Sequence, residues 1–461
     1  MILRELFLPP AAGPVLLPLA GAFTRPTFRR VLVLLVGAVL ASGGRTVTGM
    51  IRAAGLLATG HYSSYHRVFS RANWSLWHPG RILAAPVVAL VPPGEPVPLA
   101  LDDTSPQHKG PHVYGKGRHR DACRSTHSHT VWVWGHKWVV LAVLVQFPFA
   151  RRPWALPVLA ALYRDAETNG KEHRRHKTPV ELARQLLRVL IRWFPGRRFI
   201  AAVDGGFSCH ELCRFARRHR EHLTLVGKFY PDAQLFEPPA RNKLGKNGRP
   251  LGRPRVKGEK LPTPRQAVAG SKILARATVN WYGGKTREIE YAGSAGFWYK
   301  SGHGLAELRW VFVRDLTGTH REEYFFCTDP SLTPEQIVAA YTGRWSIEVT
   351  FQEVRKHLGF ATPRNWRQNS VLRTGPCLLA LFSIVSLIYH EHLRQLRGRK
   401  PAPHKTPWYD KPEPTFSDAL AAVRRLFWTR SVFAHPPLRP LVQKLPSQLR
   451  NFMLDRLALA G

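Results

Sequence analysis

The pattern of apolar and polar positions divides the chain into a helical N-terminal part and a longer part in which strands and helices alternate. In the first part, apolar residues recur at helical spacing in three segments: 31–41, 46–57 and 61–77. A proline-rich stretch at 92–98 follows, and such a stretch is typical of a domain boundary. We therefore predict a helical N-terminal domain over residues 1–93. Its segment 45–52 resembles the short helices of DNA-binding modules, so we expect this domain to bind DNA.

Beyond the boundary, short apolar runs bounded by polar residues predict five strands, at 97–101, 130–134, 138–146, 199–203 and 224–228. Helices are predicted between them from their capping residues. Thr178 and Glu181 form a capping box that begins a helix ending near residue 194. Ser208 and Glu211 form a second box, which predicts a helix ending near residue 219. Strands that alternate with helices predict an α/β fold with mostly buried strands.

A basic segment interrupts this alternation. Between residues 241 and 260 there are eight Lys or Arg residues and one acidic residue, among many glycines and prolines, so no regular core element is expected there. Strand-like pieces follow at 273–281, 288–292 and 308–314, and they predict a β-rich basic insertion over residues 231–315. Its arginines near Gly-Arg-Pro repeats resemble hooks that enter the minor groove of DNA: Arg249, Arg253 and Arg255. The alternative is a solvated basic loop that contacts phosphates without sequence preference.

Composition narrows the class of partner. The 461 residues include 68 Lys or Arg and 30 Asp or Glu, a formal net charge of +38, which indicates a polyanion: nucleic acid first, an anionic membrane second. The apolar runs are too short, or carry too many polar residues, to span a bilayer, so we expect no membrane association. Five scattered cysteines give no disulfide framework, and the N-terminus makes a poor signal peptide. We expect a cytoplasmic, nucleoid-associated protein.

Acidic residues stand at the ends of two predicted strands. Asp102 and Asp103 close one strand, and Asp204 closes another. Clustered carboxylates repel one another, and divalent cations remove that repulsion, so this placement indicates a metal site. The alternative is that each aspartate caps a turn or pairs with an arginine.

A third acidic residue comes from a predicted helix with clear limits. Thr333 is the N-cap, Gln336 completes a capping box, and Gly359 ends the helix. At about 100° per residue, one polar stripe contains Tyr341, Arg344, Glu348 and Arg355. Glu353 falls on the opposite side, so the geometry favours Glu348 as the third acid. The alternative is that Arg344 and Glu348 form an ordinary surface pair.

Three motifs together resemble a known family. They are Leu-Asp-Asp-Thr at 101–104, Val-Asp-Gly-Gly at 203–206, and Tyr341-x-x-Arg344-x-x-x-Glu348. The arrangement resembles insertion-sequence transposases of the DDE superfamily, in the branch with a Tyr-Arg-Glu-Lys signature, over roughly residues 97–360. The resemblance implies a ribonuclease-H-like core formed by 97–230 and 316–395, with the β-rich insertion between its second Asp and its Glu. A basic C-terminal region, 396–461, follows.

The resemblance also implies the site. Asp103, which precedes Thr104 as the first aspartate of the family precedes Thr, would be the first catalytic metal ligand, with Asp102 as the alternative. Asp204 and Glu348 would be the second and third ligands of two Mg²⁺ ions, which Mn²⁺ could replace.

Other residues are implied to contact DNA. Tyr341 and Arg344 would bind phosphates of the transposon end. The last residue of the signature falls on Arg355, with Lys356 one residue out of register. Tyr324 is the nearest match to a tryptophan on which some relatives stack a flipped base.

The predicted function is that of a DNA transposase, which cleaves transposon ends and joins their 3′-hydroxyls to target DNA. Its partners would be end repeats and target DNA, and we expect a homodimer or larger assembly on paired ends. Two alternatives remain open at this point: a catalytically inactive DNA-binding protein or repressor derived from a transposase, and a metal-dependent nuclease without strand transfer.

Overall fold

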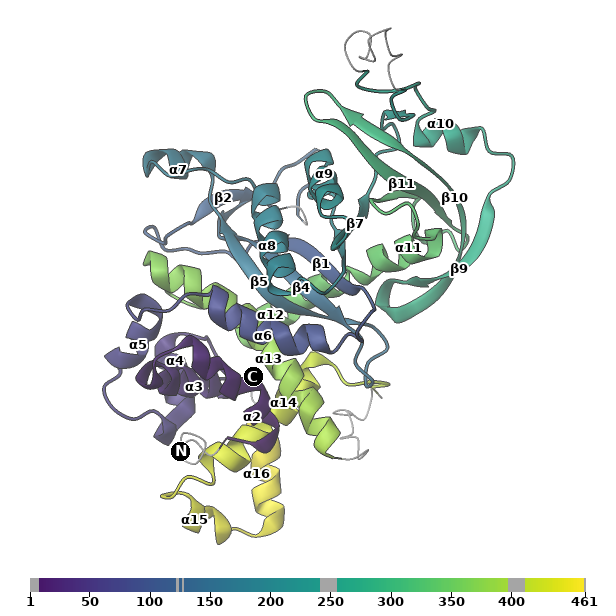
Figure 1. The fold of residues 1–461 in the computed structure, drawn as a ribbon. Helices are drawn as coiled ribbons and strands as arrows, with labels where there is room; N and C mark the ends of the chain where they lie inside the picture. The colour runs from purple at the N-terminus through teal and green to yellow at the C-terminus, as the bar shows by residue number, and fades with distance from the viewer. Residues whose placement is uncertain (1–7, 122–123, 127, 241–254, 397–410, 460–461) are drawn as a thin grey trace. The chain divides into compact units, whose positions relative to one another are not determined.

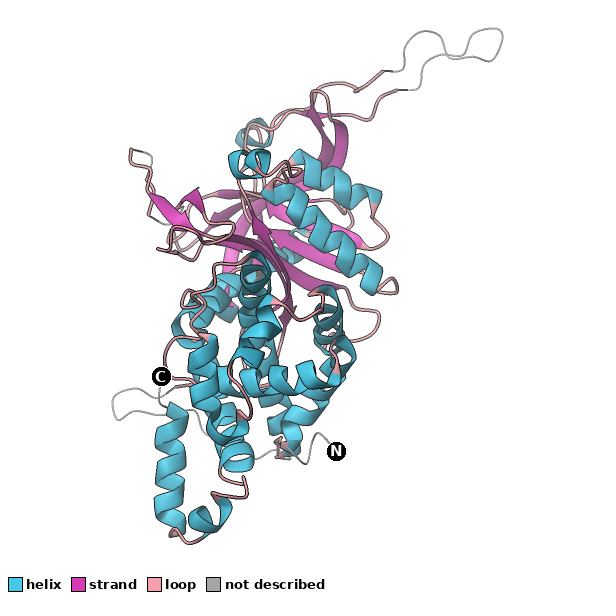
Figure 2. Ribbon diagram, turned by 90° about the vertical axis from the view of Figure 1, so that its left-hand side faces the viewer, coloured by secondary structure: helices cyan, strands magenta, loops and turns pink. Residues whose placement is uncertain are grey.

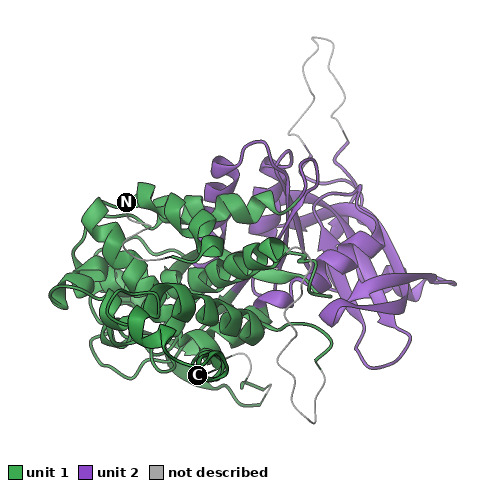
Figure 3. Ribbon diagram, turned by 90° about the horizontal axis from the view of Figure 1, so that it is seen from below, with its two compact units in different colours: residues 1–91, 103–177, 348–461 green, residues 92–102, 178–347 purple. Residues whose placement is uncertain are grey.

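The chain forms two compact units, each assembled from segments that are far apart in sequence. The computed structural model describes residues 8–121, 124–126, 128–240, 255–396 and 411–459 (Figure 1). Unit 1 contains Met1–Val91, Asp103–Lys177 and Glu348–Gly461, and unit 2 contains Pro92–Asp102 and Thr178–Ile347 (Figure 3). One division therefore falls at the start of the proline-rich stretch, between Val91 and Pro92. The other divisions differ from the predicted domain limits, which stay a prediction.

Unit 2 is built on a mixed sheet. Its strands are β1 (Val97–Thr104, whose last two residues belong to unit 1), β6 (Phe199–Val203), β7 (Leu223–Lys228), β8 (Leu235–Phe236), β9 (Ala275–Trp281), β10 (Lys285–Lys300), β11 (Gly304–Asp315) and β12 (Glu323–Cys327). The order is β1-β6-β7-β12-β11-β10-β8, and β9 also pairs with β10. The β1–β6 and β6–β7 pairs are parallel, whereas the other pairs are antiparallel. The unit therefore combines a parallel half with an antiparallel half.

Helices lie on both faces of this sheet. The helices of unit 2 are α8 (Pro179–Trp193), α9 (His210–Arg218), α10 (Pro264–Ala269) and α11 (Pro334–Gly343), with a 3₁₀ turn, η4 (Tyr282–Gly284). Tyr341 of α11 contacts the Phe325 ring, whereas His210 of α9 contacts Trp298, which neighbours Phe326. Since successive strand residues point to opposite faces, α11 and α9 cover opposite faces of β12.

Unit 1 is mainly helical. Its helices are α2 (Gly13–Leu16), α3 (Arg25–Leu40), α4 (Val47–Ala54), α5 (Ser63–Ser70), α6 (Trp77–Ala89), α7 (Ala166–Lys171), α12 (Ser346–Leu358, which begins in unit 2), α13 (Gln368–Gln395), α14 (Phe416–Phe427), α15 (Arg439–Gln443) and α16 (Ser447–Leu459). Short 3₁₀ or π turns are η1 (Pro10–Ala12), η2 (Leu17–Ala22), η3 (Gly55–Leu57) and η5 (Trp428–Val432). Figure 2 shows these helices in cyan and the strands in magenta.

Two antiparallel hairpins complete unit 1. One is formed by β4 (Lys137–Val145) and β5 (Trp154–Tyr163), with a bulge after Leu141. The other is formed by β2 (Gly117–Arg120) and β3 (Trp132–Gly135). Helix α13 packs on β5. It also lies close to the Trp138 ring of β4 at Gly375, where the Cβ of any other residue would come within 2.5 Å of that ring.

Helix α13 is long and apolar. Its 28 residues include an 18-residue window that is apolar enough to cross a membrane by length and composition, and 67% of that window is buried inside the protein. Burial of this extent is what the core helix of a globular unit shows, because its apolar side chains pack on neighbouring elements.

Buried arginines bind the C-terminal ends of helices in unit 1. Arg424, 3% exposed, donates hydrogen bonds to the carbonyls of Val39 and Ala41 at the end of α3. The Arg45 guanidinium donates hydrogen bonds to the backbone carbonyls of Ala38 in α3 and His357 in α12. Burial lowers the pKa of both guanidinium groups to about 10, so they remain cationic at neutral pH. Part of the positive charge therefore stabilises the fold, since cations are favourable at helix C-termini. Arg45 in particular is not available to read DNA.

Most predicted elements are present, and three details were wrong. The helix predicted over 61–77 is α5, which ends at Ser70, and the next helix, α6, begins only at Trp77. The α/β fold is confirmed, as are all five strands predicted before residue 230, the capping box of α8 and the strands of the β-rich segment. However, Ser208 does not cap α9, whose N-cap is Cys209; the Ser208 hydroxyl donates to the Asp204 carbonyl instead. The helix predicted from Thr333 to Gly359 is two helices, α11 and α12, interrupted at Arg344 and Trp345.

Candidate active site

Two aspartates lie side by side at the ends of adjacent parallel strands in unit 2. In the register of β1 and β6, Leu101 is opposite Val203. The next residues, Asp102 and Asp204, are therefore opposite each other, and their side chains point to the same face of the sheet. Both carboxylates contact one guanidinium: Arg344 Nη1 is 2.5 Å from Asp102 Oδ2, and Nη2 is 3.5 Å from Asp204 Oδ1.

Asp103 points to the opposite face of β1, because side chains alternate along a strand. Its carboxylate lies 2.9 Å from Lys137 Nζ of β4. The sequence did not decide between the two adjacent aspartates, and the deciding information is the register with β6, which only the folded sheet supplies. The register favours Asp102 as the partner of Asp204. The assignment of Asp103 as first ligand stays a prediction.

Arg344 owes its position to the break between α11 and α12. Thr333 caps α11 and forms the predicted capping box with Gln336. After Gly343 the backbone leaves the regular helix, and the Arg344 side chain is almost fully buried, at 5% exposed, against Asp102. A buried charge without partners is costly, and here two carboxylates offset the burial of the guanidinium. The prediction that Arg344 binds DNA phosphates stays a prediction.

Tyr341 was placed on a polar stripe, and that placement was wrong. The side chain is 2% exposed and belongs to the hydrophobic core of unit 2, with Ile337, Val338 and Phe325 among its neighbours. Burial raises the pKa of its phenol. The helical-wheel angle failed because α11 ends before Arg344, so Tyr341 and Glu348 are on different helices.

Glu348 is a half-buried residue in the first turn of α12. Seven residues on, Arg355 lies on nearly the same side of the helix, at about 20° from Glu348. The Arg355 guanidinium donates a short hydrogen bond to Thr104 Oγ1, the last residue of β1. The stripe of α12 that carries Glu348 therefore faces the end of β1. Thr350 also holds the helix in place, because its hydroxyl donates a hydrogen bond of 2.8 Å to the Ala155 carbonyl of β5.

The remaining predicted DNA contacts are dispersed. Lys356 and Arg255 are exposed, whereas Arg249 and Arg253 lie outside the described residues. Tyr324 on β12 is partly buried, and its ring packs on Phe312 at a centroid distance of 5.1 Å. None of these DNA contacts is tested by the fold. Sequence reasoning missed Lys137 and the role of Thr104, for which no local pattern exists.

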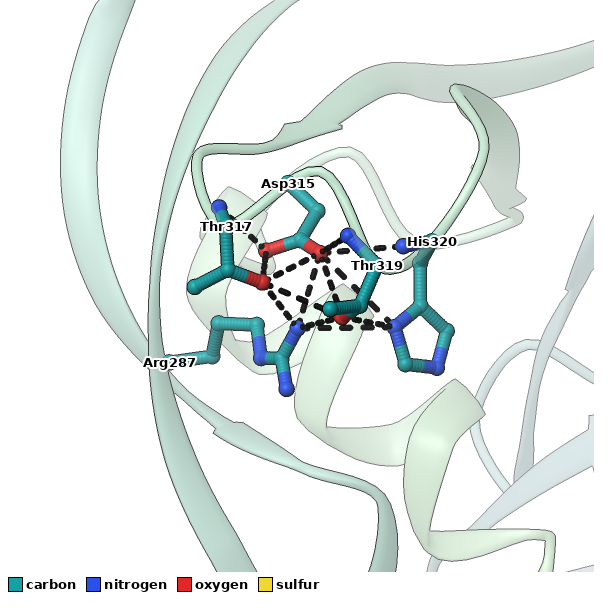
Figure 4. Close-up of polar contacts among 5 residues, drawn as sticks. All are labelled: Arg287, Asp315, Thr317, Thr319 and His320. Atoms are coloured by element: carbon teal, nitrogen blue, oxygen red, sulfur yellow. Dashed lines mark hydrogen bonds and ion pairs between the residues drawn. The ribbon is translucent and has the colours of Figure 1, made fainter.

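An aromatic cluster borders Arg344 in unit 2. Trp345, 46% exposed, packs edge-on to Tyr282 at 5.9 Å, and the Tyr282 ring stacks on His320 at 5.6 Å. His320 is held by a loop that closes around Asp315 (Figure 4). The Asp315 carboxylate, 1% exposed, accepts hydrogen bonds from Arg287 and from donors of Thr317, Thr319 and His320; each of these two threonines contributes its backbone amide and its hydroxyl.

Acidification is expected to weaken this loop. Burial by itself would raise the pKa of Asp315, but the hydrogen bonds from Thr317, Thr319 and His320 outweigh burial and lower that pKa below its ordinary value. A lowered folded-state pKa gives stability that is present above the unfolded-state pKa, near 4, and is lost as the pH falls further. Asp315→Asn should therefore lower the free energy of unfolding by about 1–3 kcal/mol at pH 7, and by less at pH 3.

Thermal unfolding of wild type and Asp315→Asn at pH 7 and pH 3 measures this difference. The matched control is Glu322→Gln in the same loop, because the Glu322 carboxylate pairs with Arg314 but is 53% exposed. An exposed pair contributes at most about 1 kcal/mol. Equal losses in the two variants, or a loss from Asp315→Asn that does not shrink at pH 3, would contradict the role of the buried carboxylate.

The donor set suits a hard divalent cation. Asp102 and Asp204 present carboxylate oxygens to one face of the sheet, where both contact the Arg344 guanidinium. Mg²⁺ and Mn²⁺ prefer such oxygen ligands. Within the part of the chain that the structure describes, no group of three or more His, Cys, Asp or Glu side chains that could hold a metal ion was found.

Paired carboxylates at neighbouring strand ends, in a chain of this positive charge, are typical of metal-dependent enzymes that act on nucleic acid. Comparison with known families agrees. The family model described as DDE superfamily endonuclease matches residues 18–288, more than half of the chain, and includes Asp102, Asp103 and Asp204. The chain therefore belongs to the DDE superfamily endonucleases. A second model, described as archaeal putative transposase ISC1217, matches residues 306–389, which include Glu348.

Among solved structures, the chain is similar to a piggyBac transposase synaptic complex with hairpin DNA, determined by cryo-EM. The two chains are 10% identical, the match covers 99% of this chain and 84% of the other, and the TM-score is 0.41. No curated protein matches the sequence. The two family models confirm the resemblance to the DDE superfamily.

Proposed function

We propose that this protein is a DNA transposase whose catalytic carboxylates are Asp102, Asp204 and Glu348 on a ribonuclease-H-like core. The observation that carries the proposal is the pairing of Asp102 and Asp204 through the β1–β6 register and their shared contact with Arg344. A family model of an endonuclease covers the segment that supplies Asp102 and Asp204, and a model of a transposase covers the segment that supplies Glu348. Parallel strands β1, β6 and β7 with helices on both faces are what such a core requires.

The three carboxylates would hold two Mg²⁺ ions, which supply activation of the attacking hydroxyl and stabilisation of the leaving oxygen. The protein's own groups position the DNA and balance charge. Arg344 contacts both aspartates, and it can exchange a carboxylate for a phosphate oxygen as substrate enters, because guanidinium groups bind both in the same geometry. Arg355 donates a hydrogen bond to the Thr104 hydroxyl, and its guanidinium can likewise donate hydrogen bonds to a phosphate.

Several features of the proposal depend on the family. Cleavage at transposon ends and joining to target DNA require that two ends be held together, and so we propose a homodimer or larger assembly. The expected place of action is the cytoplasm, where the nucleoid lies. The many surface arginines and lysines supply affinity for both DNA molecules, and binding should fall steeply as salt increases.

A product analysis tests the proposal against its alternatives. Purified protein is incubated with supercoiled DNA that carries the flanking ends of its own element, with Mg²⁺ or with EDTA, and products are mapped by sequencing. A transposase gives end cleavage and joined target products only with Mg²⁺, whereas a nuclease gives cleavage without joining. Binding without any cleavage in Mg²⁺ would refute the proposal and favour a repressor. Glu348→Gln serves as the control for contaminating nucleases, since it should leave binding intact and remove cleavage.

A further inference from the structure

The β2–β3 hairpin of unit 1 has one buried and one exposed face. His119 and Val133 are buried, at 5% and 7% exposed. The residues that alternate with them, Arg118, Arg120, Trp132 and Trp134, are all exposed. The inner face thus anchors the hairpin to unit 1, and the outer face consists of two arginines and two tryptophans.

The two tryptophans of this outer face are unusually accessible. Trp132 is 49% exposed and Trp134 is 58% exposed. Indole rings bury more apolar surface than almost any other side chain, so two of them left in solvent side by side indicate a binding surface. They are two residues apart on β3, which places them about 6.8 Å apart along the strand. That distance is about twice the thickness of a stacked base.

Cations already lie on these rings. The Arg118 guanidinium is 4.7 Å from the centroid of the Trp132 ring, and Lys116 Nζ is 5.6 Å from that of Trp134. In the register of the hairpin, Arg118 is opposite Trp134 and Arg120 is opposite Trp132, so charged and aromatic side chains alternate across the face. A flat group can thus stack on an indole while a neighbouring cation meets its negative charge.

The surrounding sequence has the charge that a polyanion requires. Between Thr104 and Arg164 there are eight Lys or Arg residues and a single acidic residue, Asp121. Asp121 itself lies 3.5 Å from the Nε atom of Arg124. An apolar protein partner would not need so many cations, whereas a nucleic acid strand needs both cations and flat surfaces.

We propose that this outer face binds single-stranded DNA, with bases stacked on Trp132 and Trp134 and phosphates held by Arg118, Arg120 and Lys116. Unpaired bases are required because the faces of paired bases in a duplex are already covered by their neighbours. A strand that is freed during end cleavage provides such bases. The choice of DNA over RNA rests on the proposed function; the stacking surface itself does not.

Binding of a fluorescent 20-nucleotide oligo(dT) to the full-length protein, measured by anisotropy in EDTA, tests this proposal. Each stacked base should contribute about tenfold to affinity, so Trp132→Ala/Trp134→Ala should weaken binding about 100-fold. The affinity for a 20-base-pair duplex should change less than about threefold. Trp132→Phe/Trp134→Phe should retain most of the single-strand affinity, because phenyl rings also stack. Arg118→Gln/Arg120→Gln should reduce the salt slope by about 0.7 for each arginine.

Phe452→Ala is the matched control. Phe452 is 56% exposed on α16, with Arg456 over its ring at 5.2 Å, but it lies outside the hairpin. Unchanged oligo(dT) affinity in the double alanine variant would overturn the proposal. So would an equal loss for the duplex, which would assign the face to duplex contact, or an equal loss in Phe452→Ala. Because no Mg²⁺ is present and no cleavage is measured, the result is independent of the catalytic carboxylates.

Discussion

Asp102→Asn is expected to lower the rate of Mg²⁺-dependent DNA cleavage at least about 10³-fold, because it removes a charged oxygen from the pair formed with Asp204. The side chain of asparagine has nearly the same shape as that of aspartate, so the loss would be of charge rather than of volume. The physical basis is the register of β1 and β6, which sets residues 102 and 204 opposite each other on one face of the sheet. Cleavage of end-containing DNA under single-turnover conditions measures the rate.

Asp103→Asn is the matched control, because the two aspartates are adjacent on β1 but point to opposite faces of the strand. Its cleavage rate should stay within about tenfold of wild type, since Asp103 lies beside Lys137 of β4. Thermal unfolding of both variants separates a catalytic from a structural loss. The reverse pattern, with Asp103→Asn inactive and Asp102→Asn active, would restore the assignment made from the Leu-Asp-Asp-Thr motif and would refute ours.

Arg424→Met is expected to give a large loss of stability in unit 1. The substitution keeps much of the side-chain length but leaves the Val39 and Ala41 carbonyls, which accept at 2.8 Å and 2.9 Å, without their donor. Hydrogen bonds from a charged donor contribute about 1.5–3 kcal/mol each, so the loss should be about 3 kcal/mol. The midpoint of thermal unfolding should fall by about 5 °C or more.

The neighbouring Arg425 provides the control. It pairs with Asp455, but it is 38% exposed and its partner is 61% exposed, so Arg425→Met should cost at most about 1 kcal/mol. Both variants remove one positive charge, and therefore their effects on DNA binding through net charge should be equal. A shift of the unfolding midpoint that is the same in the two variants would contradict a structural role for Arg424.

These arginines change the interpretation of the net charge. The excess of Lys and Arg led to a prediction of a polyanionic partner, and the family supports DNA as that partner. Yet Arg45, Arg373 and Arg424 donate to backbone carbonyls at helix ends, and Arg344 binds two aspartates. The net charge includes these buried arginines, although they are not available to bind a polyanion. Burial and ion-pair partners are properties of the folded chain, so composition does not reveal them.

The sequence predicted elements well where the pattern was local. The strand Phe199–Val203, the capping box of Thr178 and the start of α11 at Thr333 were all predicted, because each depends on residues within about six positions. The end of that last helix was not predicted. The periodicity of residues 341–348 does not predict that the helix is interrupted there. Because of the interruption, Tyr341 packs in the hydrophobic core and Arg344 contacts the aspartates.

The sequence by itself determined the family, and it identified the acidic residues near the strand ends and the candidate Glu348. It could do so because motifs and strand limits depend on residues that are close together in the sequence. Only the tertiary structure decided which of two adjacent aspartates lies beside Asp204, and that two tryptophans of a short hairpin share an exposed face with two arginines. Both decisions depend on strand register. Register is set by pairing between distant segments, and a shift of one residue would turn every side chain to the other face.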